Sequence, residues 1–357
     1  QENILQAMNH LAVRNATGDV ISMVRSLVPF WVQKSEFSIG RAWIAAAKRI
    51  CPDPGNRDSA SLAMLSGWLS WAAGNFSDAE TDLVKAAGLF TRIGDDAGRI
   101  RTELHLSITY FLQGRIPESL SACETVAGAA ERFGDPDLLA DVEQVLGNIA
   151  WVKKGDHEKA REHYARALET YRSAGNEFKA AITINNTGTI DRQLGDVEAA
   201  ELKFKAALPV LEDFGMFHYL RYTLCNLGEL CLATGRFTDA LAWFEDVKKT
   251  ALRKFDYPYV ACGLIGIAES YLGLGDRDLA EQHAQEAADV AGRLGDTVEL
   301  GMAHRVLGQV AAAREDRAEA RRFFESAERI LSELEEIEEL AKVRAEREKL
   351  RDTGGTG

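Results

Sequence analysis

The stretch NLGELCLATGRFTDALAWFEDV, from Asn226 to Val247, contains the pattern that decides the fold. Apolar residues recur at helical spacing on both sides of Gly235. A glycine after a helix supplies the left-handed residue that ends it, so Gly235 marks the turn between two helices. Gly228 and Ala240 flank this turn and are small enough for two helices to approach each other closely. The stretch therefore predicts a helical hairpin.

The same pattern recurs every 40 or 41 residues along the chain. One hairpin cannot bury its apolar face alone, so consecutive hairpins are expected to stack into a solenoid. Extrapolation towards the N-terminus gives about eight units. The first turn of each unit is expected at Ser35, Gly74, Gly114, Gly155, Gly195, Gly235, Gly275 and Glu315, and the second at Gly94, Gly134, Gly175, Gly215, Phe255 and Gly295. The Asp or Asn that follows many of these glycines is expected to cap the next helix.

Glycines and large side chains occupy fixed places in the repeat. Glycines seven residues before a turn are expected to allow close approach of the two helices of a hairpin, at Gly67, Gly188, Gly228 and Gly308. Large residues after the turn are expected to pack as knobs between units, at Leu83, Tyr164, Phe204, Phe244 and Phe324.

The stretch from Asn226 to Val247 resembles the tetratricopeptide (TPR) pattern, in which Leu-Gly, a turn glycine, alanines and aromatic residues alternate. The resemblance covers about residues 20 to 335, although the usual unit has about 34 residues. Long units of this kind resemble the sensor arrays of bacterial signal-transduction ATPases, including maltose-activator-type regulators. Leu27 to Ala47 is similar to the first repeat after the ATPase and winged-helix modules of such proteins. The resemblance implies an all-α, right-handed α-α superhelix, a TPR solenoid of about eight hairpins.

The expected organisation is a single solenoid over residues 1–351. Residues 1–17 are an N-terminal helix or the remnant of a preceding repeat, and 18–335 form eight repeats. Residues 336–351 are a C-terminal capping helix, because this charged stretch has few apolar positions and suits a solvated end of the array. The tail 352–357 is expected to be disordered.

Charge and composition exclude several classes of protein. The net charge of −13 argues against nucleic-acid binding by this chain and against an anionic membrane surface. No apolar run approaches the roughly 20 residues of a membrane span, and no signal-type segment is evident. The five cysteines form no CxxC motif, which is typical of reduced thiols in a cytoplasmic protein.

Sequence motifs for catalysis are missing. The chain contains no P-loop, HExxH, GxSxG or dinucleotide-binding motif, and the seven histidines lie mostly in different units. We therefore expect a binding module without a cofactor or metal, and not an enzyme.

The TPR resemblance implies that the first helix of each hairpin lines a concave groove that holds a partner. Carried over unit by unit, the groove positions are apolar in the early units and polar or acidic from Thr189 onward. Aromatic residues at this spacing are also common in cores, and the polar ones also form local hydrogen-bond networks. The expected site comprises Trp68, Trp71, Ile108, Phe111, Asn185, Thr189, Arg192, Glu229, Glu269, Arg305 and Gln309.

The predicted function is protein or ligand binding as the sensor array of a larger cytosolic signalling regulator. The alternative is a free-standing adaptor that links proteins in a complex. The expected partner is a protein or peptide segment, and a small-molecule inducer stays open because maltose-activator-type proteins bind a sugar on such an array. The groove pattern favours a ligand with an apolar end, an anionic or hydrogen-bonding middle and a basic end.

Overall fold

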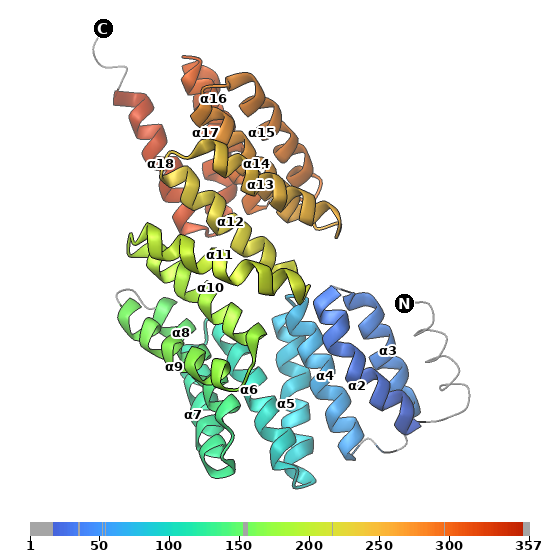
Figure 1. The fold of residues 1–357 in the computed structure, drawn as a ribbon. Helices are drawn as coiled ribbons and strands as arrows, with labels where there is room; N and C mark the ends of the chain where they lie inside the picture. The colour runs from blue at the N-terminus through green and yellow to red at the C-terminus, as the bar shows by residue number, and fades with distance from the viewer. Residues whose placement is uncertain are drawn as a thin grey trace. The chain divides into compact units, whose positions relative to one another are not determined.

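The computed structural model describes residues 17–34, 36–51, 53, 55–152, 156–215, 217–295 and 297–352. These residues form 17 helices and contain no strand (Figure 1). The predicted all-α class is therefore confirmed. Most of the expected N-terminal helix, residues 1–16, and most of the expected tail, residues 353–357, lie outside the described residues.

Two kinds of helix alternate along the chain, and we call them first and second helices after their order in each repeat. The first helices are α2 (Thr17–Lys34), α4 (Arg57–Ala72), α6 (Asp96–Leu112), α8 (Pro136–Val152), α10 (Glu177–Gln193), α12 (Phe217–Ala233), α14 (Tyr257–Leu274), α16 (Val298–Ala313) and α18 (Ile337–Asp352). The second helices are α3 (Phe37–Ile50), α5 (Phe76–Arg92), α7 (Ile116–Phe133), α9 (His157–Ser173), α11 (Val197–Asp213), α13 (Phe237–Leu252), α15 (Arg277–Gly292) and α17 (Arg317–Glu333).

The described turns between helices lie where the repeat predicts them, and the expected turns at Ser35 and Gly155 lie outside the described residues. Described turn glycines such as Gly235 have positive φ angles, which glycine adopts without steric cost. Phe255 and Glu315 occupy two of these slots without being glycine, and they too are left-handed, with φ of 56° and 65°. The position in the repeat therefore dictates the backbone conformation even where the residue does not favour it.

Capping by the Asp or Asn after the left-handed turn residue is confirmed at some turns and wrong at others. The carboxylates of Asp95, Asp276 and Asp316 accept hydrogen bonds from backbone N–H groups three residues later. The side chains of Asn75 and Asp256 make no such bond. The N-termini of these two helices are therefore stabilised by backbone hydrogen bonds and by tertiary packing, without a side-chain cap.

The glycine positions face the large knob residues, which refines the expected packing. A Cβ added to Gly228 would lie 2.6 Å from the ring of Phe244 in the same hairpin. Phe244 also fills the space above Gly266 of the next first helix, where a Cβ would lie 2.3 Å from the ring. The knobs therefore pack within hairpins as well as between neighbouring units.

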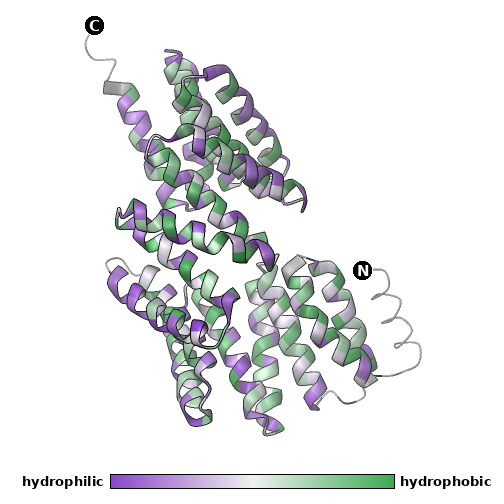
Figure 2. Cartoon of the chain, in the orientation of Figure 1, coloured by the Kyte–Doolittle hydropathy of each residue, from purple (hydrophilic) through white to green (hydrophobic). Residues whose placement is uncertain are grey.

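The chain divides into two compact units. Unit 1 comprises residues 1–190 and 210–216, and unit 2 comprises residues 191–209 and 217–357. Each unit has apolar cores between its helices, and the polar residues gather at turns and on outward faces (Figure 2). In unit 1 one core surrounds Val24, Trp31 and Leu69, and in unit 2 one core surrounds Leu264 and Val306.

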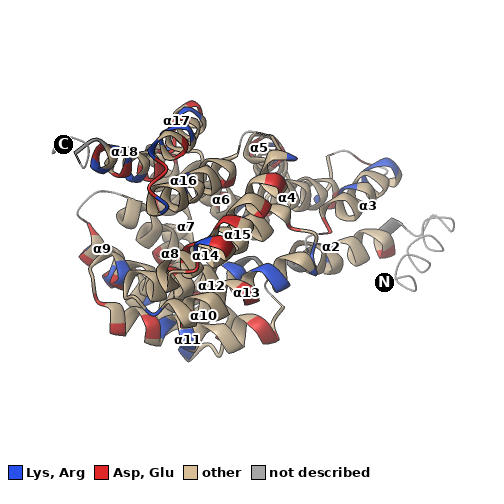
Figure 3. Ribbon diagram, turned by 90° about the horizontal axis from the view of Figure 1, so that it is seen from above, with Lys and Arg blue, Asp and Glu red and all other residues tan. Residues whose placement is uncertain are grey.

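Helix α18 is packed against α17 and α16 of unit 2. Its Val343 is fully buried, and it carries alternating acidic and basic residues along its length (Figure 3). No helix among the described residues has an apolar stretch that is long enough to cross a membrane.

Candidate functional site

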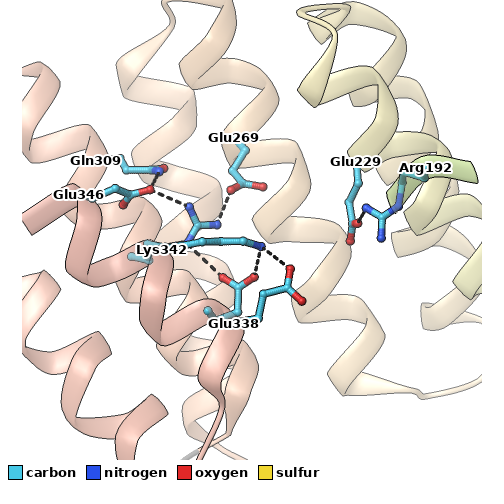
Figure 4. A network of polar contacts seen from close by, with 9 residues as sticks. Arg192, Glu229, Glu269, Gln309, Glu338, Lys342 and Glu346 are labelled. Atoms are coloured by element: carbon cyan, nitrogen blue, oxygen red, sulfur yellow. Dashed lines mark hydrogen bonds and ion pairs between the residues drawn. The ribbon is translucent and has the colours of Figure 1, made fainter. Parts of the chain in front are cut away.

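A row of polar side chains runs across the first helices of unit 2 (Figure 4). Side chains of successive first helices touch one another at separations of 36 to 41 residues, which is one repeat. We call this surface the first-helix face of unit 2. Its polar residues are Arg192 on α10, Glu229 on α12, Glu269 on α14, Arg305 and Gln309 on α16, and Glu338, Glu339, Lys342 and Glu346 on α18.

Arg192 and Glu229 form an ion pair at one end of the row. Nη1 of Arg192 donates to Oε2 of Glu229 at 2.5 Å. The surrounding helices partly remove water from the Glu229 carboxyl, and this desolvation raises its pKa. The positive charges of Arg192 and Lys342 oppose that shift. Glu229 nevertheless keeps 47% of its side chain exposed, so this carboxylate stays open to a ligand.

A pocket of about 250 Å³ adjoins this ion pair. It is lined by Arg192, Tyr222, Cys225, Asn226, Glu229, Pro258, Tyr259, Cys262 and Glu299. These residues come from α10, α12, α14 and α16, all of which are first helices. The pocket therefore opens on the first-helix face.

Two hydrogen-bond donors in the pocket have no partner among the described residues. The amide nitrogen Nδ2 of Asn226 and the Nε atom of Arg192 are both buried and make no hydrogen bond within this part of the chain. Asn226 as a whole is only 3% exposed. A buried donor without a partner costs about 1–3 kcal/mol, so both atoms are poised to bind an acceptor such as a carbonyl or carboxylate oxygen.

The wall of the pocket is fixed by Arg221 on α12. This buried guanidinium lies over the ring of Tyr259, 4.6 Å from its centroid, and pairs with the carboxylate of Asp256. Burial raises the pKa of the Tyr259 hydroxyl, so the phenol is neutral at physiological pH. The contact joins α12 to α14 beside the pocket.

The other end of the row is a compact cluster around Arg305. Arg305 is buried and donates to Glu269 at 2.5 Å and to Glu346 at 3.3 Å, and its Nε lies 3.4 Å from Glu339. Gln309 donates to the same Glu346 oxygen at 2.7 Å. Two of the predicted ligand-binding residues, Arg305 and Gln309, are thus already engaged by carboxylates of α18.

Lys342 completes the cluster. Its Nζ lies 2.6 Å from Glu339 and 3.4 Å from Glu338 (Figure 4). The cluster contains two cations and four carboxylates, so its net charge is negative. A cationic ligand group is therefore favoured along this end of the face.

The predicted residues of unit 1 lie between core and surface. Trp68 is half-buried against the N-terminal core and stacks on His105, with ring centroids 5.7 Å apart. Trp71 is also half-buried, and its buried indole Nε1 makes no hydrogen bond with the residues that the structure describes. Ile108 and Phe111 are half-buried and pack against the core between α6, α7 and α8. Among the described residues, these four are not surrounded by a polar network comparable to that of unit 2.

The predicted polar patch on α10 belongs to two different units. Asn185 and Thr189 are buried in unit 1, and the Thr189 hydroxyl donates to the Asn185 carbonyl at 3.3 Å. Arg192 belongs to unit 2. The buried pair thus takes part in the local hydrogen bonding that the sequence left open as an alternative.

Sequence reasoning missed two groups of site residues. The pocket residues Asn226, Tyr259 and Cys262 were not among the residues expected to line the groove. The α18 residues Glu339, Lys342 and Glu346 were assigned to a solvated cap. Asn226 is one helical position after Cys225, so a wider set of phases on each first helix would have included it.

Residues 140–351 match the family model of the MalT-like TPR region, which is more than half of the chain. The chain belongs to the MalT-like TPR family. The match includes every helix that contributes to the first-helix face of unit 2. The resemblance to long-unit sensor arrays is thereby confirmed.

Relatives of this MalT-like TPR chain include response regulator aspartate phosphatase J of Bacillus subtilis strain 168, which is 31% identical over 162 residues. That match covers 43% of this chain and 42% of the relative. The fold is similar to that of a signal-transduction ATPase with a tetratricopeptide repeat sensor from Pyrococcus horikoshii, with a TM-score of 0.68 and 15% identity over 96% of this chain and 54% of that one. It is also similar to a Rap protein complexed with competence and sporulation factor, with a TM-score of 0.60 and 17% identity over 99% of this chain and 98% of that one. The chain thus spans less than half of the phosphatase and about half of the ATPase.

None of the described residues forms a group of three or more His, Cys, Asp and Glu side chains that would hold a metal ion. The chemistry that the first-helix face offers is hydrogen bonding and charge pairing.

Proposed function

We propose that this chain is the sensor array of a cytosolic signalling regulator and binds an extended peptide or protein segment on the first-helix face of unit 2. One residue of the segment enters the pocket between α10, α12 and α14. Its backbone carbonyl accepts hydrogen bonds from Asn226 and Arg192, and a basic side chain pairs with the exposed carboxylate of Glu229. The effector function belongs to another part of the regulator.

The observation that supports this proposal is the pair of buried donors, Nδ2 of Asn226 and Nε of Arg192, that make no hydrogen bond with any residue the structure describes. Both require an acceptor oxygen, and both lie in a pocket that is also lined by the carboxylates of Glu229 and Glu299. A peptide offers carbonyl acceptors and cationic side chains at regular spacing along one chain. A peptide can therefore supply an acceptor oxygen for the two donors and a cation for the carboxylates at the same time.

The size of the pocket favours a segment over a small molecule. Sites for drug-sized ligands have volumes of about 300–1,000 Å³ and enclose most of the ligand. A pocket of about 250 Å³ has room for one side chain, while the rest of a segment would lie along the face. The net negative charge around Glu269 and Glu346 then favours basic residues in the part of the segment that lies beyond the pocket.

Two structures of similar fold contain a bound partner. One is the Rap protein complexed with competence and sporulation factor, and the other is NprR in complex with its cognate peptide NprX, with a TM-score of 0.56 and 13% identity. These complexes support a segment as ligand for this fold.

The test is selection of binders from a random peptide library displayed against the whole chain. Enriched peptides should contain a basic residue, and their affinities should be measured by calorimetry against the wild type and two variants. Asn226→Ala removes this amide, and we expect affinity to fall by about 5- to 150-fold, because one buried hydrogen bond contributes about 1–3 kcal/mol. Glu229→Gln removes the carboxylate charge and should weaken binding of the basic peptides.

Gln285→Ala is the matched control, because Gln285 is an exposed amide on the second helix α15 of the same unit. It should bind the peptides as the wild type does. Library selection without enrichment, or enriched peptides that bind Asn226→Ala as tightly as the wild type, would contradict the proposal.

A further inference from the structure

Cys225 and Cys262 form a thiol pair across two neighbouring first helices. Cys225 lies on α12 and Cys262 on α14, and their Sγ atoms are 3.6 Å apart. Both residues line the pocket beside Asn226. Cys225 is buried and Cys262 is half-buried, so a reagent that enters the pocket meets Cys262 first.

The three other cysteines contact other groups. The Sγ of Cys51 lies 3.3 Å from the hydroxyl oxygen of Ser59, at the start of α4. Cys123 is buried in an apolar core of unit 1, and Cys231 is buried in the apolar core of unit 2 that also contains Cys225. Cys231 lies on the same helix as Cys225 and is only 1% exposed, which makes it a close internal reference.

The electrostatic surroundings of Cys225 contain charges of both signs. The thiol contact with Cys262 and burial raise the pKa of Cys225, and the neighbouring charge of Arg221, one helical turn earlier, acts in the opposite direction. Cys225 is therefore protonated while it contacts the Cys262 thiol, and it must lose this proton before it can attack a disulfide. We assign it the second step of an exchange reaction because that step takes place within the molecule, between two sulfur atoms that are already neighbours.

We propose that Cys225 and Cys262 are a redox modification site, at which a low-molecular-weight disulfide oxidises the pair to an intramolecular disulfide that narrows the pocket. The narrowing is a form of regulation that rests on the proposed segment-binding function. The disulfide itself depends only on the geometry of the two thiols.

The exchange proceeds in two steps. The Cys262 thiolate attacks one sulfur of the reagent RSSR, so that a Cys262–S–S–R bond forms, the bond within RSSR breaks and one RS⁻ leaves. The Cys225 thiolate then attacks Sγ of Cys262, so that the Cys225–Cys262 bond forms and the second RS⁻ leaves. The two cysteine protons end on the two RS⁻ groups, so one RSSR is reduced to two RSH while two thiols are oxidised.

Bond formation changes the walls of the pocket. A disulfide has a sulfur–sulfur distance of about 2.05 Å, so the two sulfur atoms must approach each other from 3.6 Å. The bond would draw the walls on α12 and α14 together next to Asn226, the residue that follows Cys225. It would also close a chain loop between residues 225 and 262, which stabilises the folded state.

The experiment uses the whole chain with excess glutathione disulfide as the probe. After exposure, free thiols are counted and non-reduced tryptic peptides are mapped by mass spectrometry. We expect the count to fall from five to three, a Cys225–Cys262 linked peptide pair, a higher melting temperature, and reversal of all three by dithiothreitol. Cys225→Ser and Cys262→Ser should each abolish the linked pair, whereas Cys231→Ser should form it as the wild type does.

Five free thiols after treatment, or a stable glutathione adduct on Cys262 without the linked pair, would overturn the site. A peptide from the library selection is then titrated into the reduced and oxidised forms, and we expect at least tenfold weaker binding to the oxidised form. Equal binding would overturn the narrowing and leave the proposed function intact. If no peptide binds the reduced form, the proposed function fails while the linked pair and the melting shift still decide whether the modification site exists.

Discussion

The guanidinium of Arg192 on α10 donates to the carboxylate of Glu229 on α12, one repeat later in the sequence, with 2.5 Å between Nη1 and Oε2. The pair is partly exposed, so it contributes little to stability, about 0–1 kcal/mol. It does fix the position of both charges in the lining of the pocket. We therefore assign the pair to the proposed recognition of a segment and not to folding.

Replacement of Arg192 by Ala should raise the pKa of Glu229 further. Surrounding helices already raise this pKa, and the charge of Arg192 is the largest effect that opposes them. Carbon-detected NMR titration of the Glu229 carboxyl, assigned with Glu229→Gln, should show a higher midpoint in the variant. The free energy of unfolding in urea should change by less than about 1 kcal/mol. A midpoint that does not move would contradict the ion pair.

Replacement of Arg305 by Met should destabilise unit 2 strongly. Arg305 is buried and contacts the carboxylates of Glu269, Glu339 and Glu346, which would be left without their shared cation. Breaking a buried ion pair by removal of one partner costs about 3–5 kcal/mol. Urea denaturation would measure the loss, and Glu346→Gln in the same chain should restore part of it. Arg322→Ala, at an exposed arginine on α17, is the control and should change stability by less than about 0.5 kcal/mol.

A methyl group at Gly228 should destabilise the protein. The added Cβ would lie 2.6 Å from the ring of Phe244, and overpacking of a core costs about 1–3 kcal/mol. Gly88→Ala is the matched control, because Gly88 lies inside α5 and an added Cβ meets nothing within 4 Å. That substitution should stabilise by about 0.5–1 kcal/mol, since alanine favours a helix. Equal effects of the two substitutions on the urea midpoint would contradict the close packing of Gly228.

Acidification should destabilise unit 1 through His105. Burial, together with the positive charge of Lys179, lowers the pKa of His105 from 6.5 to about 4. The unfolded chain thus takes up a proton near pH 6.5, while the folded chain stays neutral until about pH 4. The stabilising contribution is complete above pH 6.5 and is lost as the pH falls from 6.5 to about 4, by on the order of 3 kcal/mol.

The check is the melting temperature of wild type and His105→Phe between pH 7 and pH 4. Phenylalanine keeps a ring against Trp68 but cannot be protonated. The variant should therefore lose less stability over this pH range than the wild type. Parallel curves for the two proteins would show that His105 does not carry the effect.

Periodicity in the sequence was sufficient to predict the helices and their turns. A 40-residue repeat of small residues and turn positions is a local property, because it reflects helix length and the left-handed residue at each helix end. The slots at Phe255 and Glu315 show this most clearly, since the repeat places a left-handed turn there without a glycine. The Leu-Gly and alanine spacing around Gly235 also led to the TPR resemblance, and the family match confirms it.

The candidate site was predicted only in part. Arg192, Glu229 and Glu269 do lie on one face of unit 2, because helical phase carries over from one repeat to the next. The partners of Arg305 on α18 were not predictable, because an alternating run of acids and bases has no periodicity that shows which face is inward.

The sequence by itself determined that the chain folds into stacked helical hairpins, since hydrophobic spacing and turn residues act within about 40 residues. Only the tertiary structure decided which polar atoms are left without partners and which thiols meet. The unpartnered amide of Asn226 and the contact of Cys225 with Cys262 depend on distances of a few ångströms between side chains of successive repeats. Such distances follow from how closely neighbouring helices pack, and packing is set by all the side chains between them at once.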